Sequence, residues 1–212
     1  MGLKLEANAL ECVRGGRMLF QNLSFSLEQG ELLEVSGPNG SGKTSLLRML
    51  CGLLAPSAGE ILWQGTSISS LKEEYFKELA YLGHANGIKG ELSAAENLRI
   101  AGGLAGRRPS EEKIAEALER VGLLDGEASL VKTLSQGQQR RLALARLLLG
   151  EQVLWILDEP LTALDSAAVR LVQSVLGEHL EGGGLAVMTT HQPLEVGAGR
   201  TVRLNLAPSS ER

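Results

Sequence analysis

Apolar residues recur along this chain with two different periods, and segments of each period alternate. Short alternating or continuously apolar runs predict strands, whereas apolar residues spaced three and four positions apart predict amphipathic helices. The predicted strands cover residues 3–8, 19–27, 31–36, 60–64, 153–157, 185–189 and 201–206. The predicted helices cover residues 44–53, 94–104, 110–121, 136–150 and 165–180. This order favours an α/β fold with a largely parallel sheet.

The middle of the chain differs from its two ends. From about residue 70 to residue 150 the helical period dominates, and the strands resume at residue 153 with a continuously apolar run. Such a run is typical of a strand that is covered on both faces. A length of 212 residues suits one domain with a buried core. We therefore expect a single domain over residues 1–212, interrupted by a helical insert at about residues 83–150.

Composition narrows the class of protein. The chain is 43% hydrophobic and 22% charged, which is ordinary for a globular protein, and its net charge is −4. An acidic balance provides no broad basic field, so nucleic-acid binding is not expected. The two arginine pairs, at positions 107–108 and 140–141, are interpreted as exposed helix positions. His179 is expected on the polar side of its helix, with no role beyond a structural one.

Features of secreted or membrane-spanning chains are not evident. Cys12 and Cys51 are isolated and have no metal-ligand spacing, which fits a reducing compartment better than a disulfide framework. No signal peptide is recognisable, and no stretch approaches the ~20 apolar residues of a transmembrane helix. A role in a membrane process would therefore be carried out from the aqueous side.

A glycine-rich loop between the strand 31–36 and the helix 44–53 carries the strongest chemical signal. It matches G-x-x-x-x-G-K-[ST] in full, and its residues are Gly37, Pro38, Asn39, Gly40, Ser41, Gly42, Lys43 and Thr44, followed by Ser45. Glycines let backbone N–H groups converge on phosphate oxygens, and the helix N-terminus adds a positive potential. Lys43 can reach the β- and γ-phosphates, and Thr44 can join a Mg²⁺ shell. The loop predicts binding of ATP with Mg²⁺.

Two acids end the apolar strand 153–157. Asp158 and Glu159 have no structural use there, since an unpaired buried carboxylate is costly. At a strand tip beside a phosphate loop, Asp158 is suited to hold Mg²⁺, and Glu159 is suited to act as general base on the attacking water. We predict that Lys43 and Glu159 are catalytic and that Thr44 and Asp158 are the metal-binding residues.

A third motif precedes the helix 136–150. The sequence Leu134-Ser135-Gln136-Gly137-Gln138 places a serine and a glycine at a helix N-terminus, where they can form an anion site. Taken alone, Ser135 is equally well explained as a helix cap. Followed by the acids and by the segment 161–165, the motif resembles the LSGGQ signature and D-loop of ABC transporter ATPases, with Gln136 in place of a glycine.

The resemblance to ABC nucleotide-binding domains spans nearly the whole chain, with four motifs in order. It implies a P-loop NTPase core with an antiparallel β portion and a helical signature subdomain. It also implies that Ser135, Gly137 and Gln138 contact the nucleotide of a second subunit in a homodimer. His191 resembles the switch histidine of the family, a catalytic residue that senses the γ-phosphate. As a lone residue it would be a loop histidine.

Two positions depart from the family pattern. An aromatic residue that stacks on adenine is usual before the first long strand, and Arg14 occupies that place here. A guanidinium can also stack on a purine, so Arg14 is a candidate nucleotide-binding residue. The glutamine expected at the start of the helical insert is replaced by Ala85, between His84 and Asn86. We expect coupling to a membrane partner to differ at this position.

Several segments resemble one subfamily, the ATP-binding subunits that serve cytochrome c maturation and haem export. They are the residues 83–84, 87–89, 96–98, 138–146, 154–160 and 189–194. This resemblance implies integral membrane permease subunits as partners and peripheral association with the cytoplasmic face of a bacterial inner membrane. It implies ATP hydrolysis linked to haem delivery or release of a haem-loaded chaperone. No haem ligand set is implied, and His84 is interpreted as structural or close to the γ-phosphate.

Other functions remain open on the sequence alone. A different ABC transporter subunit would share this chemistry and move another cargo. A soluble ABC ATPase of DNA repair usually carries a long coiled-coil insert, and one of translation usually carries two ATPase domains; this chain shows neither. A small-molecule kinase would leave the signature motif and His191 unexplained.

Overall fold

The computed structural model describes residues 2–124, 129–190, 194, 196–197 and 199–207. Its strands are β1 (Lys4–Arg14), β2 (Arg17–Glu28), β3 (Glu31–Ser36), β4 (Ala58–Trp63), β5 (Thr66–Ser67), β6 (Leu79–Leu82), β7 (Leu154–Leu157), β8 (Leu185–Thr189) and β9 (Arg200–Asn205). Its helices are α1 (Lys43–Leu50), α2 (Ile68–Leu71), α3 (Glu73–Glu78), α4 (Ala94–Leu104), α5 (Glu111–Arg120), α6 (Gln136–Leu148) and α7 (Ser166–Glu181), with a 3₁₀ turn at Val131–Thr133. None of the described helices is both long and apolar enough to cross a membrane.

The strands form two sheets. The first is parallel throughout, with the order β6-β7-β8-β3-β9, and the second is antiparallel, with the order β2-β1-β4-β5. All four residues of β7 and all five of β8 are buried, because both faces of these strands are covered. The predicted α/β class with a parallel core and an antiparallel β portion is confirmed.

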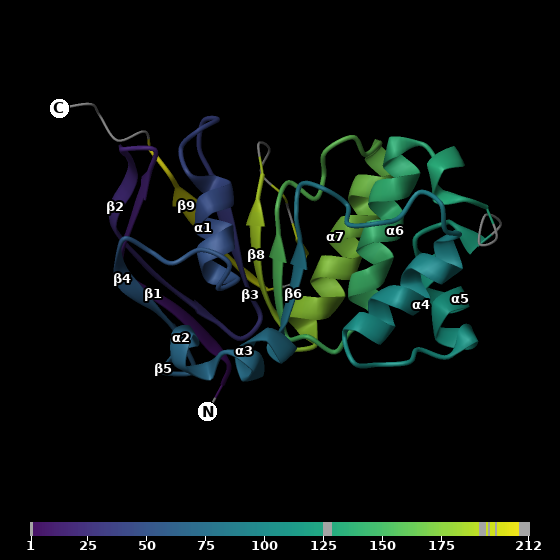
Figure 1. Cartoon of the computed structure of the whole chain (residues 1–212), viewed down its shortest axis with the longest axis horizontal. Coiled ribbons are helices and arrows are strands. Elements are labelled where there is room, and N and C mark those ends of the chain that lie inside the picture. Colours follow the sequence, from purple (N-terminus) through teal and green to yellow (C-terminus); the bar gives the residue numbers. More distant parts are fainter. Residues whose placement is uncertain (1, 125–128, 191–193, 195, 198, 208–212) are drawn as a thin grey trace.

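The two faces of the parallel sheet are covered by different helices. On β7, Leu154 and Ile156 point into a core that α1 and the antiparallel sheet complete. The alternate residues Trp155 and Leu157 point into a second core, formed with α6 and α7. Figure 1 shows α1 between the antiparallel sheet and the parallel strands, and α6 and α7 beyond those strands. The phosphate-loop helix and the signature helix therefore cover opposite faces of one sheet.

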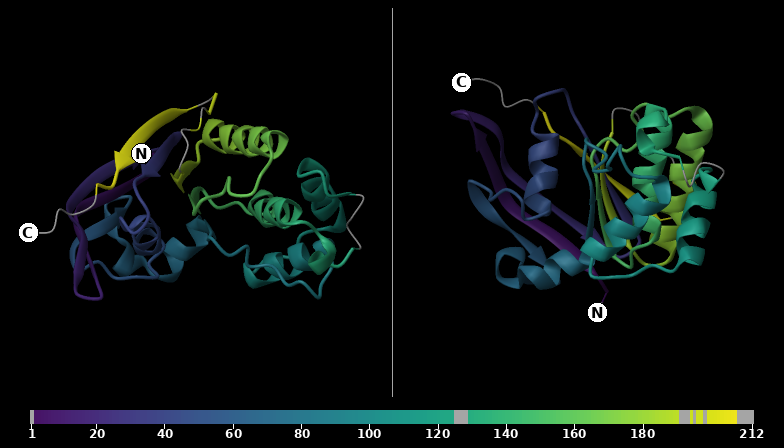
Figure 2. Two further views of the ribbon diagram at one scale, coloured as in Figure 1. Left: turned by 90° about the horizontal axis from the view of Figure 1, so that it is seen from above. Right: turned by 45° about the vertical axis from the view of Figure 1, so that its right-hand side comes forward.

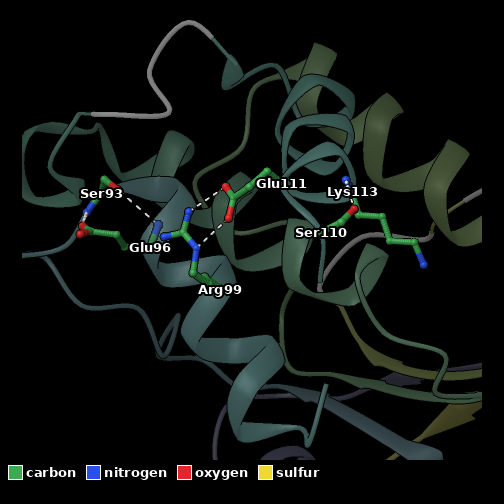
Figure 3. Close-up of polar contacts among 6 residues, drawn as sticks. All are labelled: Ser93, Glu96, Arg99, Ser110, Glu111 and Lys113. Carbon is green, nitrogen blue, oxygen red and sulfur yellow. Dashed lines mark hydrogen bonds and ion pairs between the residues drawn. The ribbon is translucent and has the colours of Figure 1, made fainter. Parts of the chain in front are cut away.

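Between β6 and β7 the chain forms α4, α5 and α6, which lie at the end of the molecule away from the antiparallel sheet (Figures 1 and 2). Their apolar sides share a third core that includes Leu98, Leu118 and Leu142. Figure 3 shows how α4 begins and is tied to α5: Ser93 and Glu96 form a capping box, and Arg99 forms a bidentate ion pair with Glu111.

Several sequence expectations need correction. The helical stretch expected from about residue 70 is interrupted by β6, which extends the parallel sheet. Arg140 was expected at an exposed position and is buried, with 5% of its surface exposed. The pair at positions 107–108 lies in the loop between α4 and α5 rather than in a helix. His179 does not face solvent: its ring is half-buried and stacks on Trp155, at 3.8 Å between ring centroids.

Candidate functional site

The phosphate loop connects the carboxyl end of β3 to α1. Gly37 has φ 145°, and a Cβ there would lie 2.5 Å from the carbonyl oxygen of Leu206, so a glycine is required. α1 begins after Gly42 with no side-chain cap. The first N–H groups of a helix have no acceptor within it, so those that follow Gly42 can bind an anion. Pro38, Asn39 and Gly40 are exposed at the tip of the loop.

Lys43 is held over this loop. Only 7% of its surface is exposed, and its Nζ donates to the carbonyl oxygens of Gly37, at 2.8 Å, and Pro38, at 3.2 Å. An ammonium group carries three N–H donors, so one further donor can point to a ligand. Thr44 and Ser45, at the start of α1, are partly exposed. The loop thus brings a fixed cation and several backbone donors to one place.

The carboxyl end of β7 is fastened to both of its neighbours. The N–H of Asp158 donates to the carbonyl oxygen of Leu82 at the end of β6, at 2.7 Å. On the other side, Thr189 Oγ1 at the end of β8 donates to Asp158 Oδ1, at 2.8 Å. β8 is in turn joined to β3, because the N–H of Thr190 donates to the carbonyl oxygen of Val35 at 3.2 Å. The ends of β6, β7, β8 and β3 therefore meet at the edge from which the phosphate loop starts.

Asp158 keeps one open oxygen at this edge. Its side chain is buried, with 2% of the residue exposed, and Oδ2 has no hydrogen-bond partner among the residues that the structure describes. Among the described residues, Ser41 Oγ of the phosphate loop is also buried and has no hydrogen-bond partner. Nearby, burial and, to a smaller extent, the Asp158 carboxylate raise the pKa of the Cys51 thiol to about 12. Buried polar atoms left open in this way are typical of a ligand site.

Glu159 has an unusual backbone. Its φ is 50°, in the left-handed region that non-glycine residues rarely adopt. Its N–H donates to Thr189 Oγ1 at 2.8 Å, so one hydroxyl group holds both acids that follow β7. Its side chain is partly exposed, and Thr162 Oγ1 donates to Oε2 at 3.4 Å. Strained residues of this kind concentrate at functional sites.

The signature motif starts α6. Ser135 Oγ accepts from the N–H of Gln138, at 3.2 Å, and Gln138 Oε1 accepts from the N–H of Ser135, at 2.9 Å. This capping box agrees with the alternative reading of Ser135 as a helix cap. A Cβ on Gly137 would lie 3.3 Å from the carbonyl oxygen of Ala163, so the motif lies against the segment after β7. Ser135 is exposed, and α6 covers the face of the sheet opposite α1.

The remaining predicted positions are less enclosed. Arg14 is exposed at the last residue of β1, where it pairs with Arg17 in the β1–β2 hairpin. Phe20 of β2 packs beside the loop glycine Gly42, so this hairpin borders the phosphate loop. His84 and Ala85 are exposed after β6. His191, the predicted switch residue, lies outside the described residues.

The sequence reasoning missed two residues of this site, Thr189 and Arg140. Thr189 is fully buried and bridges both acids, and only its place at the end of a predicted parallel strand could have suggested it. The sequence pattern predicted that Arg140 is one of two adjacent arginines at exposed helix positions. The structure places its guanidinium on the backbone of residues 158–160, and burial lowers its pKa while the Asp158 and Glu159 carboxylates oppose that shift.

Comparisons with known proteins agree with this geometry. Residues 20–162 match the ABC transporter family. The cytochrome c biogenesis ATP-binding export protein CcmA of Nitrosospira multiformis is 55% identical over 202 residues, which cover 95% of this chain and 98% of that protein. The protein of the same name from Vibrio vulnificus is 45% identical and covers 90% of this chain and 93% of its own length.

Solved structures show the same fold. An ABC transporter ATP-binding protein from Pyrococcus furiosus superposes with a TM-score of 0.83 at 28% identity, covering 95% of this chain and 97% of that one. A second structure, an ATP-binding subunit of an ABC transporter, gives a TM-score of 0.80 at 25% identity and covers 97% and 88%. The chain therefore belongs to the ABC transporter family, as an ATPase subunit related to the cytochrome c biogenesis exporters.

Proposed function

We propose that the chain hydrolyses ATP at the sheet edge where the phosphate loop and the ends of β7 and β8 meet. One observation carries this proposal. The buried Oδ2 of Asp158 has no hydrogen-bond partner among the described residues, and it lies at the same edge of the sheet as Lys43, whose Nζ donates to the phosphate loop. Backbone N–H groups of the loop and the Lys43 ammonium would bind the β- and γ-phosphates. Arg14, at the end of the neighbouring hairpin, would stack on the adenine.

Mg²⁺ fits the residues present. In the described part of the chain no three His, Cys, Asp or Glu side chains are grouped to hold a metal, so a closed protein cage is not available. Mg²⁺ does not need one, because it keeps several waters and binds through one or two protein groups together with substrate phosphates. Asp158, through its open oxygen, and Thr44 would hold the ion. When bound, it neutralises negative charge on the phosphates.

Glu159 is the proposed general base. Glu159 follows Asp158 directly in the sequence. The Thr189 hydroxyl accepts from its N–H and so fixes the position of the backbone from which the side chain extends. It would accept the proton of the water that attacks the γ-phosphorus. His191 would donate a hydrogen bond to the γ-phosphate and respond to its loss.

A complete site would need two copies of the chain. Ser135 caps α6 and Gly137 and Gln138 lie in its first turn, and this helix covers the face of the sheet opposite α1. They would therefore meet the γ-phosphate held by the other copy, in a head-to-tail dimer. The whole chain, residues 1–212, would act as one ATPase domain, with residues of about 83–150 as its helical insert.

The cargo follows from the relatives alone. Proteins named as cytochrome c biogenesis ATP-binding exporters match 90% or more of this chain, so we assign it the same process. ATP hydrolysis would be coupled, through integral membrane permease subunits, to haem delivery or to release of a haem-loaded chaperone. The chain would act as a peripheral subunit at the cytoplasmic face of a bacterial inner membrane.

Purification of the native membrane complex through this chain tests both parts of the proposal. We expect haem-handling membrane proteins to co-purify, whereas another permease would indicate another cargo. The same preparation should hydrolyse ATP, and Glu159→Gln should lower the turnover number by about 100-fold or more, because the step loses its base. Wild-type turnover in Glu159→Gln would contradict the role of Glu159.

A further inference from the structure

One arginine of α6 contacts the segment that follows β7 at the edge of the sheet where the proposed site lies. Arg140 lies on the second turn of the helix that Ser135 caps, and its guanidinium is buried. Nη2 donates to the carbonyl oxygens of Asp158 and Glu159, both at 2.8 Å, and Nε donates to that of Pro160, at 3.3 Å. Three consecutive carbonyl groups after β7 thus share one cation.

The same guanidinium holds the end of β6. Nη1 donates to the carbonyl oxygen of Gly83, at 3.0 Å, and to Asn86 Oδ1, at 2.9 Å. A guanidinium has five N–H donors in a fixed plane, and here all five have an acceptor. Because none of these acceptors is a carboxylate, the contacts form no local ion pair. They define positions, and they join three segments that are far apart in sequence.

The contact at Glu159 bears on its conformation. A residue with φ near +50° costs about 1–3 kcal/mol relative to a relaxed backbone and persists only where its surroundings hold it. The peptide groups of Glu159 are held on both sides: its N–H by the Thr189 hydroxyl and its carbonyl oxygen by Arg140 Nη2. Thr189 belongs to β8 of the sheet, whereas Arg140 belongs to α6 of the helical part of the chain.

Arg146, two turns further along α6, makes a related but smaller connection. Its Nη1 donates to the carbonyl oxygens of Asn86, at 3.1 Å, and Gly87, at 3.2 Å, and among the described residues it makes no hydrogen bond to the segment after β7. Arg141, next to Arg140, donates to the carbonyl oxygens of Val121 and Gly122 after α5. Arg140 and Arg146 therefore both hold the segment 83–87, Arg141 holds the turn after α5, and Arg140 alone among the three holds the backbone of Glu159.

We infer that Arg140 is a positioning residue for ATP hydrolysis, and this inference rests on the proposed role of Glu159. It fixes the backbone of the general base and ties it to the segment 83–86 that leads into the helical insert. Displacement of the insert relative to the sheet would then move Glu159, while the phosphate loop on the other face would keep its nucleotide. A lysine cannot replace it, because an ammonium has three donors and no planar fork.

The test compares Arg140→Lys with Arg141→Lys in the purified membrane complex. Both variants keep the charge and change the same chemistry on adjacent residues. Arg140→Lys should lower kcat by about 10- to 100-fold, as expected for a misplaced catalytic group, with KM for ATP within about twofold of wild type. Arg141→Lys should leave both constants close to wild type. Equal kcat values for the two variants would overturn the inference.

A second variant covers the case in which Arg140→Lys does not fold. Asn86→Ala removes one acceptor of the guanidinium and leaves the cation in place. It should lower kcat with KM unchanged, by less than Arg140→Lys would, and a kcat equal to wild type would count against the positioning role. Glu159→Gln, measured alongside, separates the two proposals. If it loses turnover while Arg140→Lys and Asn86→Ala do not, the inference fails and the proposed function stands; if it retains turnover, both fail.

Discussion

At the scale of single residues, the site depends on a few buried polar groups that each hold more than one partner. The Thr189 hydroxyl accepts from the N–H of Glu159 and donates to Asp158 Oδ1, both at 2.8 Å. That arrangement leaves Asp158 Oδ2 as the open acceptor. The side chain that holds both acids in place is therefore the uncharged Thr189 of the neighbouring strand β8.

Replacing Thr189 with Val keeps the shape of the side chain and removes both hydrogen bonds. The buried N–H of Glu159 then loses its partner, so the free energy of unfolding should fall by about 1–3 kcal/mol. ATP turnover should fall as well, because both acids lose an anchor. Denaturant unfolding and ATPase assays on Thr189→Val and on the control Thr189→Ser measure this. Equal stability and turnover in the two variants would show that the hydroxyl has no such role.

At the scale of elements, the strongest periodic segments are predicted well. The predicted strands 31–36 and 185–189 and the helix 94–104 coincide with β3, β8 and α4. Errors arise where a turn breaks the period. β1 continues to Arg14, beyond the predicted end at residue 8. The prediction stops too early because Ala9 has φ 48°, and the buried positions change there from Leu5 and Ala7 to Leu10 and Cys12. A bulge of this kind reverses the alternation on which the prediction depends.

Helix ends show the same limit. α1 ends at Leu50, three residues before its predicted end, because Gly52 takes φ 68° and turns the chain although the apolar run continues. The candidate site is recognisable because its acids, loop and signature each have a fixed local pattern. Arg140 and Thr189 have none: their roles arise from contacts across 18 and 31 residues of chain, which only the assembled sheet defines.

The packing of α7 against β7 and β8 should make stability depend on pH. His179 of α7 stacks on Trp155, and its Nε2 lies 3.1 Å from the carbonyl oxygen of Leu185, so that nitrogen carries the proton. Burial lowers the pKa of His179 below its ordinary 6.5, despite the opposing backbone hydrogen bonds. The unfolded chain therefore binds the proton first, and this stabilising contribution is present above about pH 6.5 and lost as the pH falls below it.

Denaturant unfolding at several pH values between about 8 and about 5 checks this expectation. The free energy of unfolding of the wild type should decrease below about pH 6.5 more steeply than that of His179→Phe, which keeps an aromatic ring on Trp155 and cannot be protonated. His84→Phe, the same substitution at an exposed histidine, is measured alongside as the control. Identical slopes for wild type and His179→Phe would contradict the assignment.

At the scale of the whole molecule, the sheet separates the two halves of the proposed site. α1, which follows the phosphate loop, covers one face, and α6, which follows Ser135, covers the other (Figure 1). Ser135 Oγ caps α6, and the proposed anion site at this helix N-terminus belongs to the helix that packs on the face opposite α1. On the proposed function, a single chain would provide two half-sites, and two copies arranged head to tail would complete both.

Molecular mass in solution is the most direct test of this shared site. In the Glu159→Gln background with ATP and Mg²⁺, the 22.6 kDa chain should be found at twice its mass. Adding Ser135→Asp should return it to the monomer mass, because aspartate still caps the helix while its charge repels the γ-phosphate. The control Ser110→Asp changes the cap of α5 in the same way and should leave the dimer intact. A dimer that tolerates Ser135→Asp, or no dimer with ATP, would contradict a site shared between two copies.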